Sequence, residues 1–355
     1  MTSRPCCGAY VLHILPIVEL KTELMTTTDP YLLKLARVAR MYYEQDLTQA
    51  EIAEQLGVSR SQISRWLTEA RDLGIVEIRI HGLWSRVAEL QYQLERRFPI
   101  KEALVMDRGG RGYMQVVQGL GVLAANRLAE LLEGEMTLGI AWSTGVYQVV
   151  SALRSARQKG VTVVQLMGAV GAQNPLLDGP DLTRWLAQTL SGQYRYLPAP
   201  LFASDPQARE AIISEPSVRE VIELAENADL ALVGIGAVSP ARYSSLFNAR
   251  RLTEEDLREI EAKGGVGDIC GYFYDIHGQL LDLELHQRLI GVSWEALYRI
   301  PVVMGVAGGR RKAAAILGAL RSGVIDYLVT DSEAAELVLE MDAAEHPEQE
   351  EGGAS

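Results

Sequence analysis

The sequence predicts an α/β protein in two parts: an N-terminal winged helix-turn-helix, then a C-terminal, doubly wound domain built on a mostly parallel sheet. Three observations support this prediction. Helical apolar spacing with two capping motifs fills residues 29–81. Beyond residue 98, short and nearly continuous apolar runs alternate with helical stretches, as in strands that helices bury on both faces. The length of 355 residues suits two domains better than one.

The composition excludes a wholly disordered chain and a chain with a generally basic surface. Hydrophobic residues make up 48% of the sequence, and the formal net charge is −12. Residues 31–80 contain seven basic and seven acidic side chains, so the acidic excess lies elsewhere. This balance is compatible with DNA binding, because only the DNA-contacting element needs local positive charge.

The sequence contains three cysteines, Cys6, Cys7 and Cys270. The first two are adjacent, which is not a metal-ligand spacing, and the third lies alone in an apolar run. A disulfide framework is therefore not expected. This usage suits a reducing cytoplasm, where we expect the protein to act.

Residues 1–28 are expected to form a flexible N-terminal extension. Their apolar run, residues 9–18, is too short to span a bilayer, and no small-residue cleavage site of a signal peptide follows it. Translation could instead begin at Met25. We expect no association with a membrane.

Two capping motifs and a turn glycine mark the helix-turn-helix in the segment TQAEIAEQLGVSRSQISRWLTEA. Thr48 opens the first helix of the motif, and Glu51 completes a capping box three residues later. Gly57 ends that helix, as a glycine in the left-handed conformation does. Ser59 opens the next helix, with Gln62 as a second capping-box partner.

The helix-turn-helix domain is predicted over residues 29–81. A first helix is expected over 31–44, and the alternating pattern of 75–80 predicts a strand, which makes the motif a winged variant. A helical pattern over 82–98 predicts a linker or dimer-contact helix.

The second domain is predicted over residues 99–341 from six apolar runs separated by helical stretches. The acidic segment 342–355 lacks apolar periodicity and is expected to be a disordered tail. The expected strands are 103–106, 136–142, 161–167, 228–235, 302–306 and 325–329.

The outward positions of the helix-turn-helix carry Arg, Ser and Gln, and its second helix has no acidic residue before Glu69. From a recognition helix, arginine can bind guanine, glutamine can bind adenine, and serine can bind phosphates or bases. The alternative is a generic helical hairpin with a solvated polar face, for which this lack of acidic residues would be unusual. We therefore predict binding to double-stranded operator DNA. The candidate residues are Thr48, Gln49, Ser59, Arg60, Ser61, Gln62, Ser64 and Arg65.

A small polar turn follows a predicted strand in the segment LGIAWSTGV, residues 138–146. Such a turn presents backbone N–H groups and hydroxyls at a helix N-terminus, and it lies at the carboxyl end of a strand, where α/β sheets bind ligands. It therefore predicts an anion site. The alternative is that Ser143 and Thr144 only cap the helix.

Three further positions could complete such a site. Gly236 ends a glycine-rich turn after the strand predicted over 228–235. Lys312 follows the turn VAGG and could reach a phosphate as a point charge, although an exposed surface lysine is the alternative. Asp268 has an apolar, glycine-flanked setting, where its carboxylate could accept hydrogen bonds from sugar hydroxyls or simply cap a turn.

The sequence contains no recognisable catalytic motif. The five histidines form neither an H-E-x-x-H motif nor a ligand cluster. No G-x-S-x-G elbow is present, and the glycine-rich turns do not form a P-loop. Gly119 and Gly121 lie in a helical stretch, where they cannot form a dinucleotide loop. We therefore expect no catalytic residue, no metal and no cofactor.

Taken together, these segments resemble the SorC-type (SorC/DeoR) sugar-responsive transcriptional regulators of bacteria. The resemblance covers about residues 31–341, and order and spacing match as well as composition. It rests on the helix-turn-helix, LGIAWSTGV, LPAPLF, LVGIG, GVGDICGYFYDIHG and VAGGRRKAAAILGALRSGVIDYLVTDSEAA. It implies an effector domain that resembles sugar-phosphate isomerases without their activity, a phosphorylated sugar as the usual effector, and a dimer or tetramer.

The resemblance also assigns roles by position. It gives the phosphate-loop role to Trp142, Ser143, Thr144 and Gly145, and it matches the family's acidic residue with Asp268 and its lysine with Lys312. Family members often have Ser-Trp-Gly in the loop, whereas this chain has Ala and Ser on either side of the tryptophan. The altered loop leaves the identity of the sugar open.

The sequence thus leads to one main hypothesis and two alternatives. The main hypothesis is a cytoplasmic transcriptional regulator whose affinity for operator DNA is set by a sugar phosphate, with relief of repression as the default direction. One alternative is a sugar-phosphate isomerase-like enzyme with a DNA-binding appendage. The other is a constitutive DNA-binding protein whose second domain only oligomerises.

Overall fold

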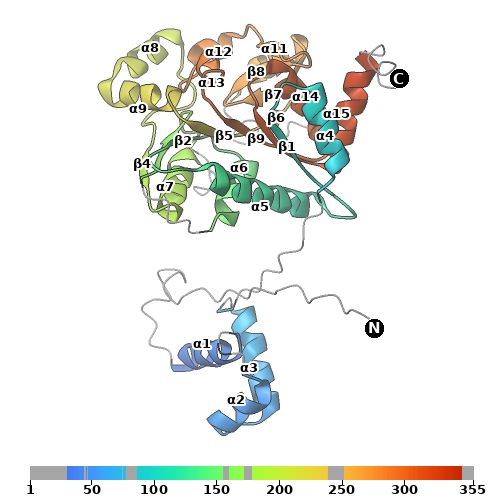
Figure 1. Ribbon diagram of the computed structural model, residues 1–355. Helices are drawn as coiled ribbons and strands as arrows, with labels where there is room; N and C mark the ends of the chain where they lie inside the picture. The colour runs from blue at the N-terminus through green and yellow to red at the C-terminus, as the bar shows by residue number, and fades with distance from the viewer. Residues whose placement is uncertain are drawn as a thin grey trace. The chain divides into compact units, whose positions relative to one another are not determined.

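The computed structural model describes residues 30–43, 45, 47–73, 75–76, 86–154, 160–171, 178–238 and 252–345 (Figure 1). The expected N-terminal extension and residues 77–80 of the predicted wing lie outside the described residues. The chain divides into two compact units, residues 1–83 and 84–355, and each is described by itself.

Three helices form the described part of the first unit. They are α1 (Pro30–Tyr43), α2 (Gln49–Leu56) and α3 (Arg60–Asp72). Their apolar faces meet in a small core that contains Leu35, Ile52, Ile63 and Leu67, each at most 3% exposed. The predicted helical spacing therefore places the expected residues inside.

The turn between α2 and α3 has the expected chemistry. The Thr48 hydroxyl accepts a hydrogen bond from the Glu51 backbone, and the Glu51 carboxylate accepts one from the Thr48 backbone at 2.8 Å. Gly57 ends α2 with φ +65°, in the left-handed region that favours glycine. Ser59 accepts from the backbone N–H of Gln62 at 3.2 Å. The expected reciprocal bond from the Gln62 side chain is not among the hydrogen bonds of the described residues.

The second unit is built on a seven-stranded parallel sheet, in the order β1-β10-β9-β5-β2-β3-β4. All six of the predicted apolar runs contain a strand, and nearly every residue of these six strands is buried, whereas β4 is exposed and was not predicted. The strands are β1 (Glu102–Met106), β2 (Thr137–Ile140), β3 (Thr162–Gln165), β4 (Gln193–Arg195), β5 (Leu230–Gly234), β9 (Val303–Val306) and β10 (Tyr327–Asp331).

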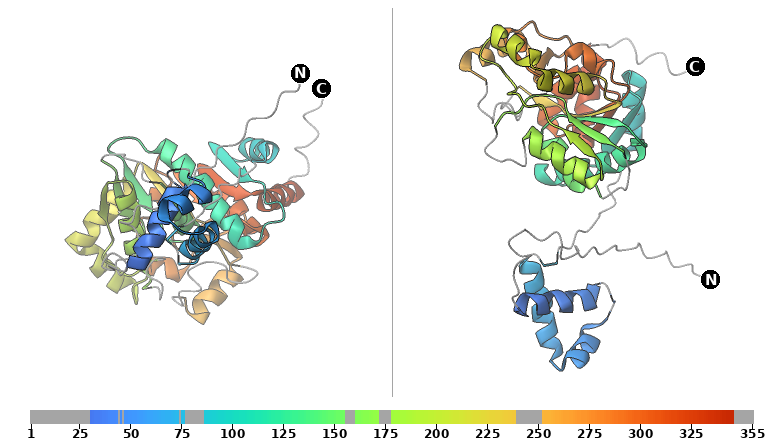
Figure 2. Two further views of the ribbon diagram at one scale, coloured as in Figure 1. Left: turned by 90° about the horizontal axis from the view of Figure 1, so that it is seen from below. Right: turned by 90° about the vertical axis from the view of Figure 1, so that its left-hand side faces the viewer.

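Helices cover both faces of this sheet, so the unit is doubly wound as predicted. Figure 1 shows α5, α6 and α7 on one face and α14 and α15 on the other, and Figure 2 shows α7 and α9 on opposite faces. Helix α5 packs closely on α6 at Gly121, where an added Cβ would lie 2.6 Å from the Gln148 backbone. The helices, with one 3-10 turn, are α4 (Ala88–Arg97), α5 (Tyr113–Leu131), α6 (Thr144–Ala152), α7 (Gly179–Thr189), α8 (Pro206–Ser214), α9 (Pro216–Glu226), α11 (Glu254–Ala262), α12 (Glu284–Arg288), α13 (Trp294–Leu297), η3 (Arg310–Lys312), α14 (Ala313–Ser322) and α15 (Ser332–Glu345).

A second, antiparallel sheet was not predicted. It consists of β6 (Gly236–Ala237), β7 (Gly265–Ile269) and β8 (Tyr272–Asp275). Asp268 therefore lies within a strand, opposite Gly236, and does not cap a turn. Gly265 and Gly267 within β7 hid the strand in the sequence, and β6 is only two residues long.

A helix forms within the segment predicted as a linker or dimer-contact helix, residues 82–98, and this helix, α4, belongs to the second compact unit. The side chains of Gln91 and Glu95 accept hydrogen bonds from the backbone N–H groups of Val105 and Ala103, at 3.2 and 2.9 Å. These groups belong to β1, at the edge of the sheet, and would otherwise lack a strand partner. The helix is therefore held in place by the edge that it covers.

Helix α15 continues to Glu345, so the prediction of a disordered tail from residue 342 is wrong for residues 342–345. Asp342 is buried and pairs with Arg97 from α4 and with Arg321 from α14, whose Nη2 lies 2.6 Å from the carboxylate. These ion pairs stabilise the helical conformation of the acidic segment. The composition of the segment alone does not reveal them. Residues 346–355 lie outside the described residues.

The ion pairs of Asp342 should make it a stability determinant. Burial by itself would raise the pKa of the Asp342 carboxyl. Hydrogen bonds from Arg97 and Arg321 lower this pKa by more than burial raises it, so the net effect is a decrease. The stabilisation is thus present above the usual carboxyl pKa of about 4 and is lost as the pH falls below it. Asp342→Ala should lower the free energy of unfolding by about 3 kcal/mol at pH 7, because Arg97 loses its acidic partner and Arg321 keeps only Glu345.

Urea denaturation at pH 7 and at pH 3.5 checks this prediction. Glu340→Gln, an exposed substitution on the same helix, is the matched control. The assignment fails if Asp342→Ala is no more destabilising than the control, or if its effect does not shrink at the lower pH.

Candidate effector pocket and DNA-binding face

A pocket lies at the carboxyl ends of β2, β5 and β9, near the middle of the parallel sheet. Strand β2 lies between β3 and β5, and the chain passes first to β3 on one side and later to β5 on the other. Parallel sheets usually bind ligands at the carboxyl ends of strands where the strand order reverses in this way. The space of the pocket, including the part open to solvent, is about 660 Å³. All seven candidate effector residues line it: Trp142, Ser143, Thr144, Gly145, Gly236, Asp268 and Lys312.

The turn from β2 into α6 forms one wall. The Ser143 hydroxyl accepts a hydrogen bond from the backbone N–H of Val146 at 3.0 Å, so Ser143 does cap the helix, as the alternative reading held. The cap leaves the first two N–H groups of α6, those of Thr144 and Gly145, without a partner inside the helix. An N-terminus of this kind attracts anions.

The wall is tightly packed against the neighbouring strand β5. A Cβ added to Gly234 would lie 2.3 Å from the Ser143 hydroxyl oxygen and 2.6 Å from its Cβ. Only glycine at the end of β5 therefore allows the Ser143 cap to form where it does. The position of the α6 N-terminus in the pocket thus depends on a residue about ninety positions away in the sequence.

Lys312 enters the pocket from η3 and is not an exposed surface lysine. Its side chain is half-buried, and its Nζ donates a hydrogen bond to the Ile235 carbonyl at 2.5 Å. Burial lowers the pKa of Lys312 to about 8, and the nearby carboxylate of Asp268 opposes this shift. Arg310 and Arg311, the other basic residues of the turn, are exposed. Lys312 is the one basic side chain among the described residues that line the pocket.

The small antiparallel sheet forms another part of the wall. Asp268 on β7 is 6% exposed and lies opposite Gly236 on β6, which brings two candidate residues together. Cys270 follows at the end of β7 with φ +53°, an unusual conformation for a residue other than glycine. Burial, followed by the charge of Asp268, raises the pKa of the Cys270 thiol well above its ordinary value, so the thiol stays protonated.

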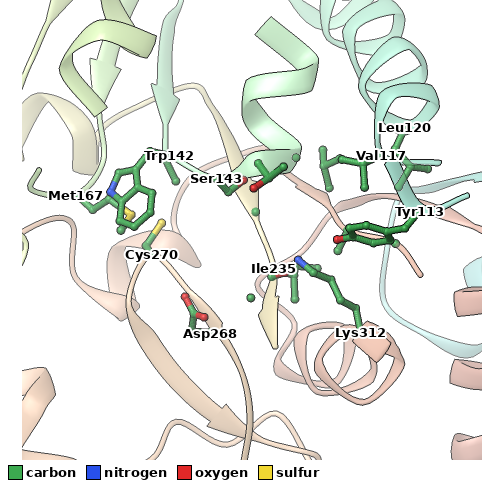
Figure 3. A pocket seen from close by; sticks show the side chains of 18 residues that line it. Tyr113, Val117, Leu120, Trp142, Ser143, Met167, Ile235, Asp268, Cys270 and Lys312 are labelled. Atoms are coloured by element: carbon green, nitrogen blue, oxygen red, sulfur yellow. Dashed lines mark hydrogen bonds between the residues drawn. The ribbon is translucent and has the colours of Figure 1, made fainter. Parts of the chain in front are cut away.

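Sequence reasoning missed several residues of the pocket. Figure 3 shows Met167 and Cys270 beside Trp142 on one side, while Tyr113 and Lys312 extend into the pocket from the other. Tyr113 opens α5, and burial together with the charge of Asp331 raises its pKa. Because no motif marked the start of this helix, the sequence did not single out Tyr113. The glycines at 109, 110 and 112 were a signal for a helix start beside a turn.

The candidate DNA-binding residues gather on the surface of the first unit. Ser59, Arg60, Ser61, Ser64 and Arg65 are exposed on α3 or at its cap. Gln49 and Gln62 are half-buried, whereas Thr48 is exposed but its hydroxyl takes part in the capping box. The acidic group nearest to this face along α3, Glu69, accepts a hydrogen bond from the Tyr31 hydroxyl at 2.8 Å. The outward residues of α3 thus present polar and basic groups.

Comparison with known proteins identifies the family. Residues 84–340 match the Sugar-bind model, which describes a sugar-binding domain, and residues 36–72 match region 4 of sigma-70. The chain belongs to the SorC-type family of sugar-binding transcriptional regulators. The resemblance expected from the sequence is therefore confirmed.

Similar proteins support the same family. The transcriptional regulator LsrR of Escherichia coli O9:H4 is 34% identical over 316 residues, which cover 86% of this chain and 94% of LsrR. LsrR of Enterobacter sp. (strain 638) is 35% identical over 309 residues, with 86% and 92% covered. The crystal structure of the full-length sorbitol operon regulator SorC from Klebsiella pneumoniae has a TM-score of 0.66 and 30% identity, with 87% of this chain and 99% of that chain covered.

The described residues also bear on membrane insertion and on metal binding. No helix among them is both long and apolar enough to cross a membrane. In the same residues, no group of three or more His, Cys, Asp or Glu side chains could hold a metal ion.

The lowered pKa of Lys312 predicts a pH dependence of stability. In the unfolded chain this amine has an ordinary pKa near 10.5, whereas in the folded chain the pKa is about 8. Between pH 8 and pH 10.5 the folded state binds fewer protons at Lys312 than the unfolded state does. The free energy of unfolding that depends on Lys312 is therefore highest above pH 10.5 and decreases as the pH falls towards 8. Wild type should therefore gain up to about 3 kcal/mol relative to Lys312→Met over this range.

Urea denaturation of both proteins at pH 7.5 to 10.5 measures this difference. Lys101→Met removes a lysine that is 51% exposed and pairs with Asp326, and it serves as the control. A stability difference between wild type and Lys312→Met that does not change with pH would show that the Lys312 amine is not desolvated.

Proposed function

We propose that this regulator binds operator DNA through the exposed face of α3 and that a phosphorylated sugar in the pocket of the second unit controls that binding. The observation that carries the proposal is the pairing of the α6 N-terminus with Lys312 in one pocket. The partial positive charge of the α6 N-terminus and the ammonium group of Lys312 act in the same pocket. Together they suit a compact anion such as a phosphate group.

The phosphate would bind at the turn between β2 and α6. The N–H groups of Thr144 and Gly145 would donate to its oxygens, and the Thr144 hydroxyl, also in the wall, could add a third donor. Lys312 would leave the Ile235 carbonyl or share its protons with the phosphate. A phosphate beside the amine would raise the pKa of Lys312, so the charged form would dominate in the complex.

The sugar would lie across the remaining pocket wall. Asp268 is a carboxylate beside Lys312, and carboxylates accept hydrogen bonds from sugar hydroxyls. The pocket is also lined by apolar groups, including Val306 and Leu120, that suit the carbon skeleton. Mixed polar and apolar walls of this kind are typical of small-molecule sites.

We propose a regulatory role without turnover of the sugar. The pocket groups that titrate are Tyr113, Asp268, Cys270 and Lys312. The thiol and the phenol have raised pKa values, which makes both poor bases at neutral pH. The similar proteins are named transcriptional regulators, which supports the same reading. An isomerase-like activity would appear as conversion of a bound sugar phosphate.

We further propose that the protein acts as a dimer or tetramer in the cytoplasm. Two copies of α3 would contact two half-sites of a symmetric operator. The effector would favour one arrangement of subunits over another, and its influence on DNA affinity can be no larger than that preference, typically about 1–3 kcal/mol. Release of the operator by the sugar is the proposed direction.

One experiment tests both parts. The operator is first selected from random-sequence DNA, and fluorescence anisotropy then measures its affinity with and without ribose 5-phosphate, glucose 6-phosphate, fructose 6-phosphate and sorbitol 6-phosphate. Sorbitol 6-phosphate is included because one similar structure is a sorbitol operon regulator. If the operator is bound but no phosphorylated or free sugar changes its affinity, the protein is a constitutive DNA binder.

The recognition helix makes a specific prediction. Arg65 is exposed on α3, so Arg65→Ala should weaken binding to the selected operator by about tenfold to hundredfold, as expected when an arginine contact to a base is lost. Anisotropy titration at fixed salt measures the change. Arg184→Ala, which removes an exposed arginine from α7, is the control and should leave operator affinity unchanged. Equal affinities of wild type and Arg65→Ala would remove Arg65 from the DNA interface.

Lys312 makes the matching prediction for the effector. Lys312→Met should bind the operator as wild type does but should lose tenfold or more in sugar-phosphate affinity, because the amine is the basic side chain of the pocket wall. In wild type, sugar-phosphate affinity should also fall as the pH rises above 8, where the free pocket loses its ammonium charge. Titration calorimetry at pH 7 and pH 9 measures both effects. Loss of operator binding in Lys312→Met would contradict this division of roles.

A further inference from the structure

One wall of the pocket contains a buried hydrogen-bond donor without an acceptor. Trp142 is 6% exposed and lines the pocket. Its indole Nε1 is fully buried and has no hydrogen-bond partner among the described residues. An indole N–H can only donate, and a buried donor that finds no acceptor keeps the full cost of its lost hydration. Such groups are rare in folded proteins and indicate a missing partner.

The surroundings of this donor do not supply a good acceptor. Figure 3 shows Met167 and Cys270 beside the indole, on the side of the pocket away from Lys312 and Tyr113. Met167 offers a thioether sulfur and Cys270 a thiol sulfur, and both are weak acceptors. Cys270 is held there at φ +53°, and its thiol is protonated because burial raises its pKa. An oxygen that enters this side of the pocket would therefore be the better partner.

The position of Trp142 in the chain fixes its relation to the proposed phosphate site. The residue directly precedes Ser143, which caps α6, so the indole belongs to the same turn as the N–H groups of Thr144 and Gly145. The ring extends to one side of that turn while Lys312 approaches from the other (Figure 3). A ligand with its phosphate at the α6 N-terminus can therefore place its carbon skeleton against the indole.

We propose that the indole N–H of Trp142 donates a hydrogen bond to a hydroxyl or carbonyl oxygen on the carbon skeleton of the effector, which makes Trp142 a specificity-determining residue. This inference rests on the proposed function. A site built to hydrogen-bond a ligand oxygen rejects analogues that lack it, because the site's own polar group then stays unpaired. The phosphate anchors the ligand, and Trp142 distinguishes one sugar phosphate from another.

The test replaces the indole by a ring that cannot donate. The full-length chain and its Trp142→Phe variant are titrated by calorimetry with inorganic phosphate, ribose 5-phosphate, glucose 6-phosphate, fructose 6-phosphate and sorbitol 6-phosphate. Trp142→Phe should weaken the best-bound sugar phosphate tenfold or more and should leave the affinity for inorganic phosphate unchanged. Trp294→Phe is the matched control, because Trp294 is 5% exposed in the same core but does not line the pocket.

The melting temperature of the ligand-free chain separates recognition from a structural role. If Trp142 is unpaired without ligand, Trp142→Phe should lower the melting temperature no more than Trp294→Phe does, because both variants lose the same buried ring volume. A larger fall, with equal losses of phosphate and sugar-phosphate affinity, would make the residue structural and overturn the inference. Unchanged sugar-phosphate affinity would overturn it as well. Wild type that binds no sugar phosphate would remove the proposed function itself, which is a different result.

Discussion

The close approach of the carboxyl ends of β2 and β5 is the constraint on which the pocket depends. Gly234 leaves just enough room for Ser143, and Ser143 in turn sets the start of α6. The backbone of Gly145 approaches the Val306 carbonyl of β9 in the same region. Three strands far apart in the sequence thus determine where one helix begins, and the helix dipole is available to a ligand only because they do.

Much of the fold follows from the sequence because its strands are buried on both faces. Such strands appear as continuous apolar runs, and the runs near residues 103 and 302 became β1 and β9. Strand β4 was missed for the opposite reason, since Gln193–Arg195 is polar and exposed. The local sequence pattern also gave a wrong prediction at Asp342, whose helical state depends on two arginines from other helices.

The site was predictable where it depends on a local turn. The Trp142–Gly145 segment and Lys312 follow strands directly, so sheet topology brings them together and the structure places both in one pocket. Met167 ends the run predicted over 161–167, but nothing in its chemistry marked it as a pocket residue. Cys270 could not be found in this way, because it follows β7 of the small sheet that was not predicted. Their effect on the site, including the environment of the Trp142 indole, appears only in three dimensions.

The helix over the edge of β1 has a consequence for aggregation. An exposed strand edge can pair with the same edge of another molecule, and folded proteins limit this by covering or blocking it. Gln91 and Glu95 already occupy N–H groups of β1, so an incoming strand would have to displace α4. At the opposite edge, all three residues of β4 are exposed, and Tyr194 and Tyr196 are among the exposed large side chains. The two edges of the sheet therefore differ in their protection, and the β4 edge is the one at which an aggregating strand would meet less resistance.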